Sequence, residues 1–195
     1  MFNKPKGCVT ARSDSINKTV MEHFPPEMRN TLHPSGRLDK DTEGFLLITD
    51  DGMLTHTLMQ PKSHVSKTYF FYAIGELTEE KIKAVSEGVY MKGRDIPALP
   101  AEITCTGTGV ITDIAHLLSD DKRERLLKFP GQKIFSGYIT ITEGKNHQVK
   151  RMLRSIGCCC VYLKRTAVGG VLLDESLAPG EYRELTDEEL LKLKR

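Results

Sequence analysis

The stretch from Gly36 to Gly52, GRLDKDTEGFLLITDDG, constrains the fold of this chain more than any other. It places four aspartates and one glutamate around the apolar run FLLIT, which ends at Thr49. Pro34 and Gly36 end whatever precedes the stretch, and DDG is a turn signal. An apolar run of this length between turn signals predicts a buried strand. We therefore expect a strand flanked by carboxylate-bearing loops, an arrangement that holds a reactive side chain in place.

The same acids approach a calcium-binding pattern. Counted from Asp39, they read D-x-D-x-E-G, and Asp50 stands at the twelfth position. An EF-hand needs a helix on each side of its loop, whereas Pro34 and Gly36 precede this loop and a turn signal follows it. We therefore expect no calcium site. No Cys-x-x-Cys or paired-His spacing predicts another metal site.

Length and composition exclude several classes of protein. A chain of 195 residues can form one core or two small lobes. No apolar run approaches the roughly 18 residues of a membrane span, and the N-terminus lacks the apolar segment of a signal peptide. Five cysteines, with Cys158–Cys160 adjacent, form no disulfide framework. We expect a cytoplasmic protein with no membrane partner, whose free thiols fill the core.

Hydrophobic periodicity, caps and breakers predict a mixture of strands and helices. Expected helices are 17–24, 53–59, 78–88, 119–129, 147–156 and one that opens with the capping box at 186–189. Expected strands are an interrupted one in the first dozen residues, 45–49, 67–75, one or two within 98–114, 134–142 and 159–163. The elements do not alternate strictly. The fold class is therefore α+β, with a mixed, largely antiparallel sheet and flanking helices.

The helix that follows Asn146 has one apolar and one cationic face. At 100° per residue, one arc carries Val149, Met152, Leu153 and Ile156, and the opposite arc carries His147, Lys150, Arg151 and Arg154. A positive helix N-terminus adds attraction for anions. Taken alone, this pattern is also that of an ordinary surface helix. Tyr69, in the strand KTYFFYAIG, is either a packed residue or a platform for a base.

Five segments together carry a resemblance to a known family. They are NKPKG at 3–7, GRLDKDTEGFLLITDDG, KTY at 67–69, EGKNHQVKRML at 143–153 and LAPGEYRELT at 177–186. In this order they resemble the RsuA/RluB/RluE/RluF type of bacterial ribosomal-RNA pseudouridine synthase, over nearly the whole chain. The ending GGVLLDESLAPGEYRELT leans toward the branch that modifies 16S rather than 23S ribosomal RNA.

The resemblance implies a role for specific residues. Asp39 matches the catalytic aspartate, Tyr69 the tyrosine that stacks on the target base and takes part in proton transfer, and Lys150 the basic residue that pairs with the aspartate. Arg37 matches an arginine that holds the RNA open around the flipped nucleotide. The remaining substrate-binding residues expected on this basis are His147, Gln148, Arg151 and Arg154.

The implied reaction suits these residue types. Conversion of uridine to pseudouridine breaks the bond between N1 and C1′, turns the uracil and joins C5 to C1′, without redox change or group addition. We therefore expect no cofactor and no metal. The carboxylate attacks C1′, attacks C6 or abstracts a proton, and the sequence leaves all three open. The uridine must leave its stack to reach the site.

The resemblance also implies an organisation. Many relatives carry a small RNA-binding S4 domain ahead of NKPKG, and this chain starts there. We expect a single catalytic domain, 1–195, with two lobes sharing a central cleft and no S4 domain, either naturally or because the chain is a fragment. A monomer acting on ribosomal RNA, free or in an assembly intermediate, is expected. The alternative is a non-catalytic RNA-binding or ribosome-assembly factor on the same fold.

Overall fold

The computed structural model describes residues 1–194. The chain forms two compact units. The first comprises Met1–Lys67 and Lys164–Arg195, and the second comprises Thr68–Leu163. Strand β7 (Cys159–Val168) begins in the second unit and ends in the first.

The first unit is built around β3 (Glu43–Thr49), which is the predicted FLLIT strand. β1 (Phe2–Lys4) pairs antiparallel with the beginning of β3, and β2 (His33–Ser35) pairs antiparallel with its end. The last part of β7 lies parallel to the start of β3, and β8 (Val171–Leu172) pairs antiparallel with β7. The remaining elements are η1 (Val20–His23), α1 (Pro26–Arg29), α2 (Gly52–Met59), η2 (Pro61–Ser63) and α6 (Asp187–Leu193).

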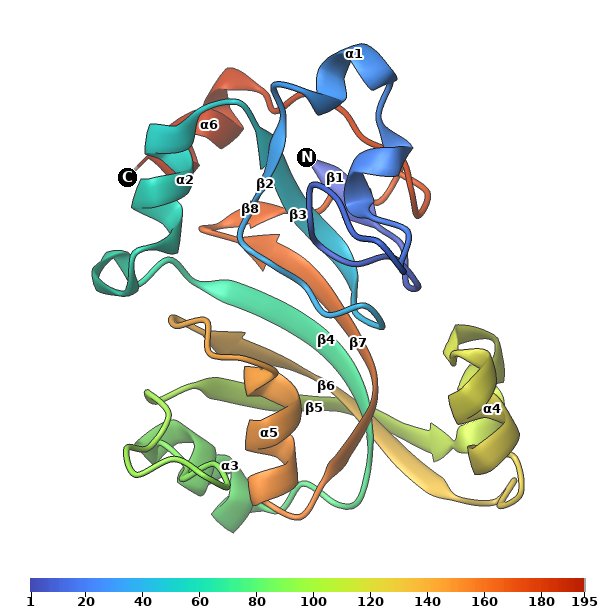
Figure 1. The fold of residues 1–195 in the computed structure, drawn as a ribbon. Coiled ribbons are helices and arrows are strands. Elements are labelled where there is room, and N and C mark those ends of the chain that lie inside the picture. Colours follow the sequence, from blue (N-terminus) through green and yellow to red (C-terminus); the bar gives the residue numbers. More distant parts are fainter. Residues whose placement is uncertain (195) are drawn as a thin grey trace. The chain divides into compact units, whose positions relative to one another are not determined.

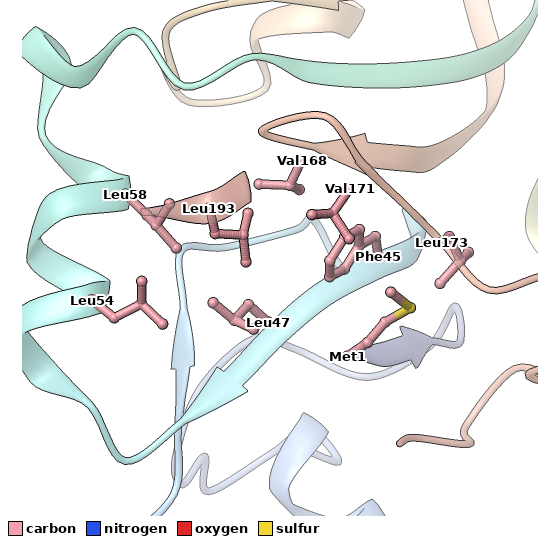
Figure 2. Close-up of a cluster of buried hydrophobic side chains, with 9 residues drawn as sticks. All are labelled: Met1, Phe45, Leu47, Leu54, Leu58, Val168, Val171, Leu173 and Leu193. Atoms are coloured by element: carbon pink, nitrogen blue, oxygen red, sulfur yellow. The ribbon is translucent and has the colours of Figure 1, made fainter. Parts of the chain in front are cut away.

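The core of the first unit joins helices and strands that are distant in sequence. Figure 2 shows Phe45 and Leu47 of β3 facing side chains from α2, α6 and the β7–β8 region. The buried members of this cluster are Met1, Phe45, Leu47, Leu54, Leu58, Val168, Val171, Leu173 and Leu193. Leu46, between the two β3 residues, is also fully buried. Because successive strand residues point to opposite faces, β3 is buried on both, as its continuous apolar run indicates.

The second unit contains a sheet in the order β7-β4-β6-β5. It is formed by β4 (Lys67–Ile74), β5 (Glu102–Val110), β6 (Lys133–Ile141) and the beginning of β7. Figure 1 shows its helices α3 (Glu79–Glu87), α4 (Asp120–Leu126) and α5 (Gln148–Ser155). The segment η3 (Ile111–Leu117) packs on the sheet through Ile111 and Ile114, which form a cluster with Leu118, Ile134 and Val161.

The predicted α+β class with a mixed, mostly antiparallel sheet is confirmed, and most predicted elements lie within a few residues of their expected positions. Thr78 and Thr186 cap α3 and α6 through their side chains, as expected. The helix predicted at 17–24 is a short 3-10 helix. Pro26, expected only to end it, opens α1, because proline is tolerated in the first turn of a helix. β5 is one strand whose register shifts between Cys105 and Gly107.

Two expectations about ligands and thiols can be compared with the structure. Strand β2 precedes the twelve-residue calcium pattern and β3 begins inside it at Glu43, so the pattern is not a loop between two helices. The expectation that all five cysteines fill the core is wrong. Cys8 and Cys158 are buried, Cys160 is half-buried, and Cys105 and Cys159 are exposed. Cys159 and Cys160 begin β7, so their side chains point to opposite faces of the strand, and that of Cys159 is exposed.

No helix within residues 1–194 has the length and apolarity required to cross a membrane.

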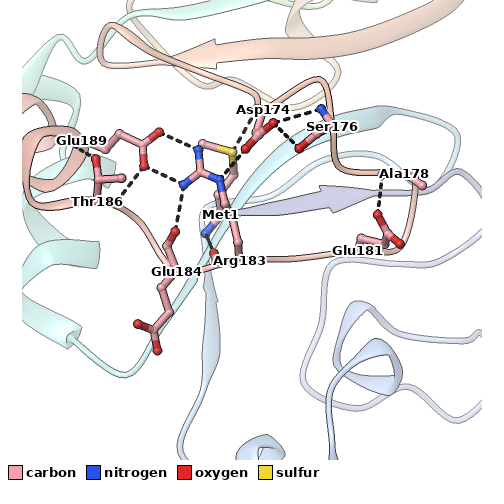
Figure 3. Close-up of polar contacts among 9 residues, drawn as sticks. All are labelled: Met1, Asp174, Ser176, Ala178, Glu181, Arg183, Glu184, Thr186 and Glu189. Carbon is pink, nitrogen blue, oxygen red and sulfur yellow. Dashed lines mark hydrogen bonds and ion pairs between the residues drawn. The ribbon is translucent and has the colours of Figure 1, made fainter.

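An ion-pair network fixes the acid-rich end of the first unit (Figure 3). Arg183 donates from Nε to Asp174 at 2.6 Å, and its two Nη atoms contact the two carboxylate oxygens of Glu189 at 2.8 Å each. Hydrogen bonds from Ser176 and then from Arg183 hold the pKa of Asp174 at about 2, and those from Arg183 hold the pKa of Glu189 at about 2. A bidentate pair of this kind is geometrically specific as well as favourable.

This network predicts a pH dependence of stability. Both carboxyl pKa values are lower in the folded state, so the unfolded chain binds more protons between about pH 2 and the ordinary values of 3.8 and 4.5. The stabilisation is complete above about pH 4.5 and is lost as the pH falls to 2. In Arg183→Met, we expect a shallower fall in the free energy of unfolding over this range, measured by chemical denaturation at several pH values. Arg125→Met, at an exposed position on α4, is the control, and equal slopes in both variants would refute the assignment.

Gly44 permits the close approach of β7 to β3. It pairs with Arg165 in the parallel register and has a φ of +99°. A Cβ at this position would collide with the carbonyl oxygen of Arg165. The glycine is therefore required twice, for its backbone conformation and for the space it leaves.

We predict that Gly44→Ala lowers the free energy of unfolding by at least about 2 kcal/mol, since strain of this kind alone costs about 1–3 kcal/mol. The matched control is Gly131→Ala, where an added Cβ meets nothing within 4 Å. That change should stay within about 0.5 kcal/mol of the wild type. Equal denaturation midpoints for the two variants would contradict the close-approach argument.

Candidate active site

Asp39 lies half-buried on the loop that joins β2 to β3, and the backbone around it is clamped on both sides. The Thr10 hydroxyl donates to the Leu38 carbonyl at 2.8 Å and accepts from the Leu38 N–H at 3.1 Å. The Gly7 N–H donates to the Lys40 carbonyl at 2.7 Å. The residues immediately before and after Asp39 are therefore both fixed by the N-terminal segment, which contains the NKPKG motif.

The side chain of Lys4 also binds the loop that carries Asp39. Its side chain is fully buried, and Nζ donates to the carbonyls of Pro5 at 2.9 Å, Thr42 at 3.0 Å and Lys40 at 3.4 Å. Burial lowers the pKa of Lys4, and nearby acidic groups, among them Asp39, oppose that shift. A buried ammonium is tolerable only with such partners. Lys4 therefore fixes the loop and places a positive charge near its carboxylates.

Two further buried cations lie in the first unit. Arg165 on β7 donates from Nε to the Phe45 carbonyl at 2.7 Å, and Lys67 donates from Nζ to the Val65 carbonyl at 2.7 Å. Burial, and then the charge of Arg165, lowers the pKa of Lys67. Sequence patterns alone assign no role to Lys4, Lys67 and Arg165. The signal that could have found them is a basic residue within an otherwise apolar strand.

Arg37, predicted to hold the RNA open, is exposed on the same loop as Asp39. Gly36, which precedes it, has a φ of +80°, and a Cβ there would lie 2.6 Å from the Met59 sulfur. The loop thus leaves β2 at a position that only glycine suits. Arg37 and Asp39 are therefore presented together by one rigid segment.

The second unit carries the predicted cationic helix as α5. Its apolar side, Val149, Met152, Leu153 and Ile156, is buried, which confirms the predicted core face. His147 precedes the helix with a left-handed backbone, φ +48°, ψ +34°. Only a small fraction of non-glycine residues adopts this conformation, and it tends to cluster at functional sites. His147 and Arg154 are exposed, while Lys150 and Arg151 are half-buried.

Gln148, predicted to bind substrate, is buried within the turn that starts α5. Its amide donates to Glu143 Oε1 at 2.6 Å and accepts from the Lys145 N–H at 2.8 Å. Lys145 in turn forms a 3.0 Å ion pair with Glu143. The structure therefore places Gln148 where it shapes the EGK turn. In the sequence, the signal for this role is that Glu143 and Gln148 lie five residues apart with Gly144 between them.

Tyr69 is buried on β4 of the second unit. The structure thus groups the predicted residues into two sets, Arg37 with Asp39 on one loop of the first unit, and the α5 residues with Tyr69 in the second. That Asp39 meets Tyr69 and Lys150 stays a prediction. Within residues 1–194, no three His, Cys, Asp or Glu side chains form a group that could hold a metal ion.

Comparison with known proteins gives consistent matches. The family model described as RNA pseudouridylate synthase matches residues 1–155. The chain is 44% identical over 191 residues to an uncharacterized RNA pseudouridine synthase of Bacillus subtilis, YtzG, covering 97% of this chain and 70% of that protein. It is 37% identical over 193 residues to the ribosomal small subunit pseudouridine synthase A of Haemophilus influenzae, covering 99% and 72%.

A solved structure agrees with the sequence matches. The crystal structure of a pseudouridylate synthase superposes with a TM-score of 0.80 at 36% identity, over 98% of this chain and 71% of that one. The family resemblance and the pseudouridine synthase fold expected from the five sequence segments are therefore confirmed. The chain belongs to the RNA pseudouridylate synthase family, and its reaction is the isomerisation of uridine in RNA to pseudouridine.

Proposed function

We propose that this enzyme isomerises one specific uridine of small-subunit ribosomal RNA, with Asp39 as its catalytic carboxylate. The observation that carries the proposal is the clamped loop, which presents Asp39 between backbone segments fixed by Thr10 and Gly7. The choice of RNA is supported by the name of the Haemophilus influenzae relative and by the LAPGEYRELT ending. The enzyme acts as a monomer in the cytoplasm, on free ribosomal RNA or on an assembly intermediate.

The chain acts as one catalytic domain whose two units share the bound uridine. The carboxylate of Asp39 acts as the nucleophile or base, and Lys150 is the basic residue that we expect to pair with it. Tyr69 stacks on the flipped uracil and takes part in moving the proton that leaves C5 when C5 joins C1′. Attack at C1′, attack at C6 and proton abstraction all use the same carboxylate.

The RNA is held by residues around these three. Arg37, on the Asp39 loop, keeps the strand open around the flipped nucleotide. His147 precedes α5 and Arg151 lies in its first turn, where a helix N-terminus attracts phosphates, and Arg154 lies in its last turn. Gln148 supports this surface from within the turn.

The first test replaces Asp39 by Asn, which keeps the side-chain volume and removes the charge. We expect pseudouridine formation to fall by at least about 10³-fold, since loss of a catalytic nucleophile removes a step and not only a contact. The measurement is tritium release from C5-labelled 16S ribosomal RNA. Asp50→Asn, at an exposed acid of the same stretch, should keep full activity.

Retained activity in Asp39→Asn would exclude this mechanism. If the wild-type protein binds ribosomal RNA but leaves every uridine unchanged, the non-catalytic assembly factor becomes the correct interpretation.

The second test addresses the loop clamp. Lys4→Met removes the ammonium and leaves the carbonyls of Pro5 and Thr42 without their buried donor, which costs about 1–3 kcal/mol of stability. We expect a lower denaturation midpoint and, at a temperature where the variant is folded, a reduced kcat because Asp39 is less well fixed. Lys18→Met, at an exposed lysine of the N-terminal segment, is the control. Unchanged kcat in folded Lys4→Met would contradict the positioning role.

A further inference from the structure

The segment between α3 and β5 (Figure 1) is an ordered loop with an internal hydrogen bond and buried side chains of its own. Residues 89–99, termed here the 89–99 loop, close on themselves where the Ala98 N–H donates to the Val89 carbonyl at 2.9 Å. Three residues of the loop are buried: Val89, Met91 and Ala98. Gly88 enters the loop with a φ of +94°, and a Cβ there would lie 2.5 Å from the Ala98 carbonyl oxygen.

The outward side chains of this loop are aromatic, apolar and basic. Tyr90 and Ile96 are exposed, with 66% and 74% of their surface accessible, and Lys92 and Arg94 are exposed as well. Two large apolar side chains that are exposed on one loop gain little from burial in the fold itself. Their position beside two cations indicates a surface that contacts another molecule.

Three hydrogen bonds fasten the loop to the turn that begins α5. Arg151 Nη2 donates to the Lys92 carbonyl at 2.6 Å, and Lys145 Nζ donates to the Pro97 carbonyl at 3.2 Å. The Leu99 N–H donates to Glu143 Oε1 at 2.9 Å. The loop is therefore continuous with the cationic face of α5. Arg151 acts here as a positioning residue for the loop, in addition to any contact with phosphate.

The 89–99 loop and the cationic face of α5 form one surface, and its charge indicates what kind of partner it binds. Its basic residues are Lys92, Arg94, Lys145, Lys150, Arg151 and Arg154. Its acids are Asp95 and Glu143, and Glu143 is already paired with Lys145. Protein interfaces are depleted of lysine at their centres, whereas an aromatic platform among cations is how proteins bind unpaired nucleotides.

We propose that the 89–99 loop is a second RNA-binding element, which holds the single-stranded RNA next to the target uridine. Lys92 and Arg94 contact phosphates, and Tyr90 stacks on an unpaired base. This proposal rests on the proposed function for the identity of the RNA, but it concerns binding outside the catalytic residues.

The test measures binding separately from turnover. We expect Lys92→Gln/Arg94→Gln to weaken binding of a 16S ribosomal RNA fragment and to lower the slope of log Kd against log salt by about 1.4–1.8, or about 0.7–0.9 per phosphate contact. Its kcat at saturating RNA should equal that of the wild type. Glutamine preserves the main chain of Lys92, which is the part that Arg151 contacts. Arg125→Gln/Lys128→Gln, an exposed pair on and beside α4, carries the same charge change and should leave the slope unaltered.

The stacking contact has its own matched pair. Tyr90→Ala should weaken binding by about 5- to 150-fold, as loss of one stacked base does, while Tyr90→Phe should keep the wild-type affinity. Thermal unfolding of each variant confirms that the fold is intact.

Several results would overturn the proposal. They are an unchanged salt slope in the Lys92/Arg94 variant, an equal loss in the α4 control, or equal affinities for Tyr90→Ala and Tyr90→Phe. Binding is measured in the Asp39→Asn background, so no turnover enters the result. If the wild-type protein forms no pseudouridine but the loop variants still bind RNA more weakly than it does, the proposed function is wrong. The RNA-binding role of the loop is then still supported.

Discussion

The buried ammonium of Lys4 is the interaction on which the Asp39 loop depends. Removing an ammonium from water is costly, and in this fold three carbonyl oxygens and nearby carboxylates compensate for that cost. Two of those carbonyls belong to the loop itself, at Lys40 and Thr42. Any movement of the loop away from Lys4 therefore leaves a buried charge poorly satisfied. The cost of burying Lys4 becomes a restoring force on the backbone around Asp39.

The opposite side of β3 provides the complementary constraint. β7 approaches so closely at Gly44 that no side chain fits, and the Arg165 guanidinium then donates to the next carbonyl of β3, that of Phe45. β3 is thus fixed by β1 with Lys4 on one edge and by β7 with Arg165 on the other. A loop that enters such a strand inherits its rigidity. This explains why the acids of the stretch Gly36–Gly52 need a buried strand next to them, although only Asp39 is assigned to chemistry.

The sequence was sufficient wherever a local rule decides the structure. Thr78 and Thr186 predict helix starts because the cap and the first turn are neighbours in sequence, and the FLLIT run predicts a strand because its burial is continuous. Lys4 could not be assigned, because two of its three partners lie 36 and 38 residues away and all three are backbone carbonyls, which leave no mark on sequence. The 89–99 loop was missed because Gly93 and Pro97 predict an irregular connection. The expectation that Gln148 binds substrate comes from the family motif, whereas helix periodicity does not predict its hydrogen bonds within the EGK turn.

Two groups of cations in this protein differ in their exposure to water. Lys4, Lys67 and Arg165 are buried and are each held by backbone carbonyls, whereas Lys92, Arg94 and Arg154 are exposed. Salt screens exposed charges strongly and buried ones weakly. In the RNA-binding roles proposed for them, the exposed cations respond to ionic strength through counterion exchange, while the buried Lys4 keeps its bonds to the loop around Asp39. A change in ionic strength should therefore act mainly on RNA binding and less on the position of that loop.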